Sequence, residues 1–165
     1  MNNPTVNFRE LLKQNSTYVN AHRPRSAPSC WLLGTIGSME HEVTKGKGTN
    51  VLIFEMLDLE PHPDTEEGLL ENVNLSKLRS PYKKSLVANF WITPDALGHL
   101  TDMLDNCVGD PERSIEERLP ETKGLRVMFK VNPVYVDGKE TDQNEIDSRT
   151  MRLAESREEN QEAAE

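Results

Sequence analysis

The sequence contains few of the residues that build metal centres, redox centres or membrane spans. Only two cysteines and four histidines occur in 165 residues, and Cys30 and Cys107 match no metal-binding or redox spacing. The histidines are equally scattered, so no zinc site is expected. No apolar run approaches the roughly 20 residues that a membrane span needs. We therefore expect two buried thiols in a reducing cytoplasm, with no metal, no cofactor and no membrane partner.

The motifs of common catalytic sites are also missing. The sequence has no phosphate-binding loop, no GxSxG turn and no glycine-rich dinucleotide fingerprint. The stretch EPHPDTEE could hold a cation through its carboxylates, but a solvated acidic loop is the commoner role of such a stretch. We therefore predict that the protein is not an enzyme.

Aromatic residues make up only 5% of the chain, and the formal net charge is −9. Both values argue at first against nucleic acid, because cations must neutralise phosphates and rings must stack the bases. The charge is unevenly distributed, however. Residues 1–50 carry six Lys/Arg and three Asp/Glu, residues 51–80 carry two and seven, and residues 138–165 carry four and nine. A local groove can differ in sign from the whole molecule, so nucleic acid is not excluded.

Strand-like patterns occur along most of the central sequence. The expected strands are residues 30–43, 50–57, 83–93 and 124–131, followed by a last hairpin at 132–146 around Asp137-Gly138. Gly34 and Gly37 permit a kink or bulge in the first strand. The glycines of TKGKGT, residues 44–49, suit the turn that follows it. The residues expected to face the core are Leu52, Phe54, Met56, Leu86, Ala88, Phe90, Ile92, Leu125, Val127, Phe129 and Val131.

One helix is clear, and its position suggests a fold. Thr93 suits the N-cap of a helix that carries apolar residues at helical spacing and ends at Gly109. Ser114 and Glu117 form a capping-box pattern for a short second helix. A helix between the third and fourth of five antiparallel strands is the arrangement of an OB-fold barrel. We predict such a mainly β fold with one or two helices, and an α+β sandwich is the alternative.

Two flanking segments differ in composition from this domain, which we expect to span residues 29–147. Residues 1–28 form an N-terminal arm, in which NFRELLKQ could make two helical turns and AHRPRSAPS favours an extended path. The arm is either a flexible leader or a basic segment that lies over a ligand through Arg23 and Arg25. Residues 148–165 form an acidic tail, and we expect a frayed helix from Asp147 onwards.

The segment from Thr93 to Ile146 carries a family resemblance. Its LDNCVGD, SIEERLPETKGLRVMFKV and YVDGKETDQNEI resemble phage-encoded OB-fold proteins that bind single-stranded DNA. The stretch GTIGSMEHEVTKGKGTNVLIFEMLD resembles their first hairpin, so the likeness covers roughly Trp31 to Asp147. It implies a protein that coats single-stranded DNA during phage replication or recombination, with Lys45 and Lys47 in the basic hairpin loop. Some single-strand binders contact replication or recombination proteins through an acidic tail, and the tail here is acidic but ends in EAAE, without the terminal apolar anchor that such tails often have.

Binding without sequence preference requires cations and exposed rings. The candidate cations are Lys45, Lys47, Lys83, Lys84, Arg126 and Lys130, with Arg23 and Arg25 in the arm. The candidate stacking residues are Trp91, Tyr82 and Trp31. For each residue the alternative is an ordinary role in turn solubility, a solvated strand face or the core. We therefore predict a non-catalytic, sequence-independent single-stranded DNA-binding protein. The alternative function is an acidic OB-like protein-interaction adaptor or a DNA-mimic inhibitor, which the acidic segments favour.

Overall fold

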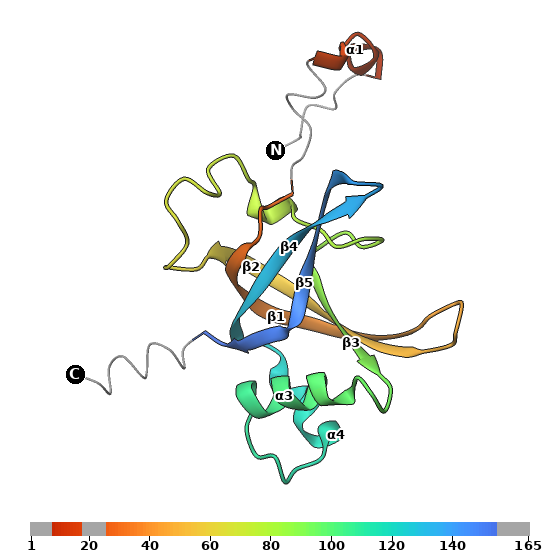
Figure 1. Cartoon of the computed structure of the whole chain (residues 1–165), viewed down its shortest axis with the longest axis vertical. Helices are drawn as coiled ribbons and strands as arrows, with labels where there is room; N and C mark the ends of the chain where they lie inside the picture. Colours follow the sequence, from red (N-terminus) through yellow and green to blue (C-terminus); the bar gives the residue numbers. More distant parts are fainter. Residues whose placement is uncertain (1–7, 18–25, 155–165) are drawn as a thin grey trace, which may run out of the picture.

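The computed structural model describes residues 8–17 and 26–154, and its centre is a five-stranded antiparallel sheet (Figure 1). The strands are β1 (Cys30–Val43), β2 (Asn50–Pro61), β3 (Val87–Ile92), β4 (Arg126–Val136) and β5 (Lys139–Leu153). They lie in the order β3-β2-β1-β4-β5, and every neighbouring pair is antiparallel. The prediction of a mainly β fold with five antiparallel strands is confirmed.

Short helices occupy three places in the chain. They are α1 (Phe8–Leu12), the 3-10 turn η1 (Leu75–Lys77), α3 (Leu97–Cys107), α4 (Ile115–Arg118) and the 3-10 turn η2 (Leu119–Thr122). The chain runs through α3, α4 and η2 between β3 and β4, and these elements lie beyond one end of the strands (Figure 1). Leu100 and Leu104 of α3 are fully buried, so this helix closes one end of the core.

The helix signals of the sequence are found in the structure, but α3 begins later than they predict. Thr93 Oγ1 accepts a hydrogen bond from Ala96 N at 3.1 Å, which forms a turn that delays the start of α3 to Leu97. Gly109 ends the helix region with a φ of +84°, a conformation that glycine adopts without steric cost. Ser114 Oγ accepts from Glu117 N at 3.1 Å and donates to Glu117 Oε1 at 3.2 Å, so Ser114 is the N-cap of α4, although the reciprocal bond from the Ser114 backbone is not formed.

Two glycines bend β1, as predicted. The β1–β2 register shifts at two places. The first lies between Leu33 and Thr35 and contains Gly34, and the second lies between Ile36 and Met39 and contains Gly37. A Cβ at Gly37 would lie 2.8 Å from a Leu57 methyl carbon, so no larger residue fits there without a shift. The bend lets β1 pair with β4 over its first half and with β2 over most of its length.

The predicted core faces are confirmed. Phe54, Phe90 and Phe129 are at most 1% exposed, and the rings of Phe54 and Phe90 meet edge to face with centroids 5.5 Å apart. Leu86 and Ala88 of the same predicted faces are also fully buried. A smaller apolar cluster on the other face of β2 and β3 contains Val51, Ile53 and Val87.

The sheet does not close into the expected barrel. Its two ends, β3 and β5, share no backbone ladder among the described strands. They are joined instead by a side-chain hydrogen bond of 2.6 Å from Ser148 Oγ to the Asn89 carbonyl oxygen. Near this point the register of β5 against β4 shifts between Met128 and Lys130, which leaves extra residues of β5 around Ser148. We call this junction between β3 and β5 the seam.

The last hairpin is longer than the sequence predicts. Its turn is Asp137-Gly138, and both residues have positive φ (52° and 77°), as a tight hairpin turn requires. After the turn β5 continues to Leu153, and Met151 is only 2% exposed. The frayed helix expected from Asp147 is therefore wrong, because buried side chains hold this segment in the sheet. The rest of the expected tail, residues 155–165, lies outside the described residues.

Candidate nucleic-acid interface

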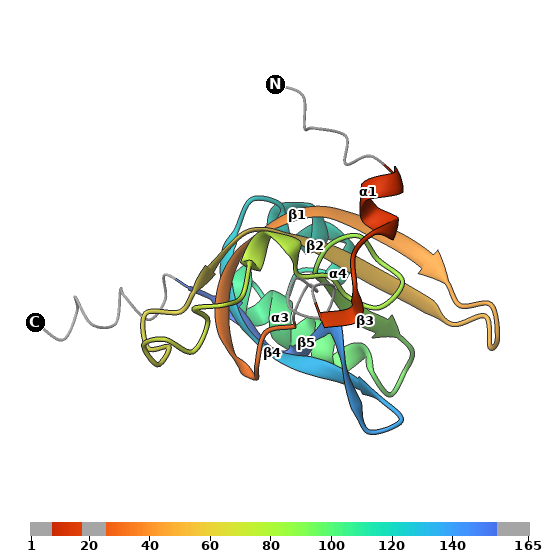
Figure 2. The same ribbon diagram turned by 90° about the horizontal axis from the view of Figure 1, so that it is seen from above.

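The hairpin between β1 and β2 presents Lys45 and Lys47. Thr44 N donates to Thr49 O at 2.9 Å, and Thr49 N donates to Thr44 Oγ1 at 3.0 Å, so the two threonines fix the base of the turn. Figures 1 and 2 both show the hairpin projecting away from the rest of the domain. Both lysines are exposed, and neither forms an ion pair with any residue that the structure describes. Their charges are available to a ligand.

Trp91 lies at the foot of this hairpin, on the outer face of β3. The side chains of β3 alternate, so Phe90 enters the core while Trp91 points outward and is 45% exposed. Its cross-strand partner on β2 is Val51, which is 5% exposed. Val51 is paired on its other side with Glu42 of β1. The indole therefore rests beside a small buried apolar cluster and keeps an exposed surface.

A groove of about 370 Å³ runs along the seam beside Trp91. The polar and charged residues that line it are Asn89, His99, Asn132, Glu145, Asp147, Ser148 and Arg149. The Arg149 side chain is 69% exposed, and its Nε lies 3.2 Å from Asp147 Oδ1. The groove thus offers one aromatic surface, amide groups, one guanidinium and two carboxylates. An exposed ion pair of this kind contributes little to stability, so Arg149 can exchange partners at small cost.

Tyr82, Lys83 and Lys84 lie on a loop that leads into β3. Ser80 fixes this loop, because its Oγ accepts from Val87 N at 3.0 Å. Tyr82 has a φ of 63° and is fully exposed at the tip. Lys83 forms an ion pair with Glu42 of β1, whereas Lys84 is exposed. Lys83 therefore fastens the loop to the sheet, and Lys84 and Tyr82 remain free to contact a ligand.

Arg126 is occupied within the fold. Its guanidinium donates to Thr35 Oγ1 at 3.1 Å and to the Asp58 carbonyl oxygen at 2.7 Å, and it pairs with Glu60. These contacts join the start of β4 to β1 and β2. An arginine with this many internal partners would have to break them to reach a phosphate.

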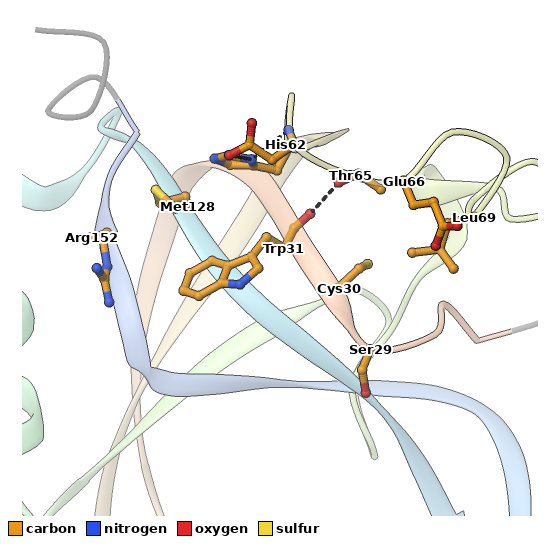
Figure 3. Close-up of a pocket in the computed structure, with 10 residues that line it drawn as sticks. Ser29, Cys30, Trp31, His62, Thr65, Glu66, Leu69, Met128 and Arg152 are labelled. Carbon is orange, nitrogen blue, oxygen red and sulfur yellow. Dashed lines mark hydrogen bonds and ion pairs between the residues drawn. The ribbon is translucent and has the colours of Figure 1, made fainter. Parts of the chain in front are cut away.

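Trp31 and Lys130 lie on the outer face of the other half of the sheet. They are partners across the β1–β4 ladder, and Lys130 is also the partner of Asp147 on β5. Trp31 lines a pocket of its own, with the Arg152 guanidinium 5.6 Å from the centre of its ring (Figure 3). The two tryptophans therefore line different pockets, and Lys130 lies between them. Arg23 and Arg25 lie outside the described residues.

The sequence-based site omits several residues that the fold places beside Trp91 or Trp31. Arg149 and Arg152 were assigned to the tail, and Asn89 and His99 were given no site role. The spacing of Ile146, Met151 and Leu153 was a signal that β5 continues, but the bulge near Ser148 breaks its alternation. Without that strand, neither arginine could be placed on the sheet.

Other kinds of site find little support in the described part of the chain. No group of three His, Cys, Asp or Glu side chains there could hold a metal ion. Cys30 and Cys107 are buried free thiols, and burial raises the pKa of Cys107 to about 12, so neither is activated as a nucleophile. None of the described helices combines the length and hydropathy that crossing a bilayer demands.

Comparison with known proteins adds no assignment to this geometry. The chain matches no protein-family model, and it matches no curated protein sequence.

Proposed function

We propose that the protein binds single-stranded DNA without catalysis and without sequence preference, along the hairpin 44–49, Trp91 and the seam groove. The observation that carries this proposal is the position of Trp91. A half-exposed indole lies where two unpaired lysines on one side and Arg149 on the other can reach the phosphates that flank a stacked base. OB-fold proteins bind oligonucleotides on the same surface, the face of the second and third strands beside the first hairpin loop.

Each group in this interface has a distinct task. A base stacks on the Trp91 indole, which contributes about 1–3 kcal/mol and is possible for every base because all have a flat face. Lys45, Lys47 and Lys84 neutralise phosphates on the hairpin side of the ring, and the exposed ring of Tyr82 offers a second stacking surface. Arg149 exchanges Asp147 for a phosphate on the groove side. Because the rings can stack on any base and the cations contact phosphates, such an interface binds DNA without sequence preference.

The biological setting follows from the family resemblance. A protein of this kind would act in the host cytoplasm on single strands exposed during phage DNA replication or recombination. The acidic tail would contact replication or recombination proteins, and it would compete with DNA for the cationic hairpin. Arg23 and Arg25, which precede the described domain, would add cations to the bound complex.

The test uses the two tryptophans separately. In a Trp31→Phe variant, Trp91 is the only indole, and titration with oligo-dT should quench its fluorescence in a saturable, salt-sensitive manner. A Trp91→Phe variant serves as the matched control, because its remaining indole lies in the other pocket. Absence of quenching in the Trp31→Phe variant, with the fold intact by circular dichroism, would overturn the proposal.

A protein-interaction adaptor is the second candidate, and the acidic segment formed by the end of β2 and the loop after it favours it. Residues 58–71 contain six Asp/Glu and no Lys/Arg. Such a surface repels DNA and attracts basic proteins. A protein that fails to bind oligo-dT but binds a basic peptide would be an adaptor.

A further inference from the structure

The pocket that contains Trp31 has a volume of about 430 Å³ and lies on the outer face of β1 and β4 (Figure 3). Its lining residues include Trp31, His62, Glu66, Leu69, Met128 and Arg152. Figure 3 shows His62 above the indole, Arg152 on one side of it and Glu66 with Leu69 on the other. This volume is within the range of about 300–1,000 Å³ that is usual for ligand pockets. We call it the Trp31 pocket.

The loop after β2 forms one wall of the pocket and is fixed to β1. The Trp31 carbonyl oxygen accepts two hydrogen bonds from this loop, one from His62 N and one from Thr65 Oγ1, both at 3.3 Å. Both bonds end at the Trp31 backbone, so they fix the start of the loop, residues 62–65, beside β1.

His62 places a hydrogen-bond donor in this wall. Its side chain is only 8% exposed, and its Nδ1 accepts from Asp64 N at 3.1 Å. The proton of the neutral ring therefore lies on Nε2. Among the described residues no side-chain nitrogen or oxygen is both buried and without a hydrogen-bond partner, so Nε2 is not an orphaned donor. It can still donate to an acceptor that enters the pocket, such as a peptide carbonyl oxygen.

The charge beside the pocket is strongly negative. A second hollow, of about 620 Å³, shares His62, Thr65 and Glu66 with the Trp31 pocket and is also lined by Glu67 and Glu71. Glu66, Glu67 and Glu71 form no ion pair with any described lysine or arginine. We call these three residues the acidic triplet.

We propose that the Trp31 pocket and the acidic triplet form a docking site for a basic segment of a partner protein. An arginine or lysine of that segment packs its aliphatic stem on Trp31, Met128 and Leu69, and its charged end lies beside Glu66. A backbone carbonyl oxygen of the segment accepts from His62 Nε2. Later cations of the segment meet Glu67 and Glu71. Arg152 closes the opposite side, so the segment enters from the loop.

Charge complementarity favours a basic peptide over nucleic acid at this site. A phosphate placed beside the acidic triplet would meet three like charges, whereas each cation of a peptide gains a partner. This inference concerns a different surface from the DNA interface and does not rest on it.

The test measures Trp31 directly. In a Trp91→Phe variant the only indole is in the pocket, and a short peptide of alternating arginine and alanine should change its fluorescence in a saturable manner. A peptide of alternating glutamate and alanine should produce no change. Isothermal calorimetry on the full chain measures the affinity, which should fall at least about tenfold when salt is raised through the range in which exposed charges are screened.

Matched charge variants decide whether the site is specific. Glu66→Gln, Glu67→Gln and Glu71→Gln together should abolish the peptide-induced change, because they remove the acidic triplet. Asp102→Asn, Glu112→Gln and Glu116→Gln together remove as much exposed charge elsewhere and should leave the change intact.

Two results would overturn the proposal. Equal loss of binding in both triple variants would mean that the peptide responds only to overall charge. A change in Trp31 fluorescence with oligo-dT in the Trp91→Phe variant would assign the pocket to nucleic acid. Because the DNA proposal is read from Trp91 in the Trp31→Phe variant, either inference can fail while the other stands.

Discussion

Trp91 and Trp31 are the two tryptophans of the chain, and both lie on outer faces of one sheet. Trp91 is beside a hairpin with two unpaired lysines and a groove that contains Arg149. Trp31 is beside the loop after β2, in which residues 62–71 contain four carboxylates and neither lysine nor arginine. Each ring also has a neighbour of the other sign, Arg152 at Trp31 and Asp147 in the groove of Trp91, so the two places differ in their balance of charge.

This difference shows why exposed aromatic rings alone do not indicate a nucleic-acid site. Stacking energy is similar for any accessible indole, so the neighbouring charges decide which class of macromolecule can approach. The net charge of −9 describes neither neighbourhood. The binding partner of each tryptophan therefore has to be tested separately.

The largest effect should come from a buried, hydrogen-bonded side chain of β5. Asn144 is fully buried, accepts from Ala27 N and donates to Ala27 O, each at 2.8 Å. Asn144→Ala should lower the free energy of unfolding by about 1–3 kcal/mol, because it leaves buried backbone groups without partners. Urea unfolding followed by fluorescence should show the same shift in the Trp31→Phe and Trp91→Phe backgrounds. Asn72→Ala, at an exposed position, is the control. A shift of the unfolding midpoint in only one of the two tryptophan backgrounds would contradict a common core.

The second prediction concerns DNA affinity at the two indoles. Trp91→Ala should weaken oligo-dT binding by about 5- to 150-fold, which corresponds to the loss of about 1–3 kcal/mol of stacking. Trp31→Ala should leave the affinity unchanged. Fluorescence anisotropy with labelled oligo-dT measures both variants, and equal weakening would show that the two tryptophans serve one DNA path.

A smaller effect should follow from the hairpin lysines. The double change Lys45→Gln and Lys47→Gln removes two phosphate contacts, so the slope of log K against log salt should become shallower by about 1.4. The matched control is Lys77→Gln with Lys123→Gln, since both of these lysines are exposed on other parts of the domain. If the control pair lowers the slope as much, the hairpin has no special part in binding.

The smallest effect should come from the acidic tail. Deletion of residues 155–165 removes five glutamates and one arginine and leaves β5 intact. Oligo-dT should then bind modestly more tightly at low salt and equally at high salt, because screening removes a long-range repulsion. Anisotropy titrations at two salt concentrations measure this. Tighter binding that persists at high salt would indicate instead that the tail occupies the interface directly.

Much of the fold followed from local sequence signals. Alternation in β2, β3 and β4 assigned the inward residues, since each strand has one fully apolar face. Gly34 and Gly37 marked the bulges of β1, and Asp137-Gly138 marked the last turn. Signals of this kind act over a few residues and survive in any tertiary context.

The features that sequence reasoning missed depend on distant contacts. The continuation of β5 past Asp147 depends on burial of Met151, and the side-chain bond across the seam joins Ser148 to Asn89, which is far away in the sequence. The pairing of Arg126 with Glu60 and of Lys83 with Glu42 joins residues far apart in the chain. Strand alternation places a side chain on a face, but it cannot say which charge will lie next to it.

The seam has a consequence for the motion of the domain. Opening it breaks the Ser148–Asn89 hydrogen bond and no backbone ladder, but it also exposes core side chains such as Phe90 of β3 and Ile146 of β5, while β1 keeps both of its neighbours. Amide protons along β3 and the middle of β5 should then exchange with deuterated solvent sooner than those of β1. Faster exchange there would show that the groove beside Trp91 widens and narrows in the native protein.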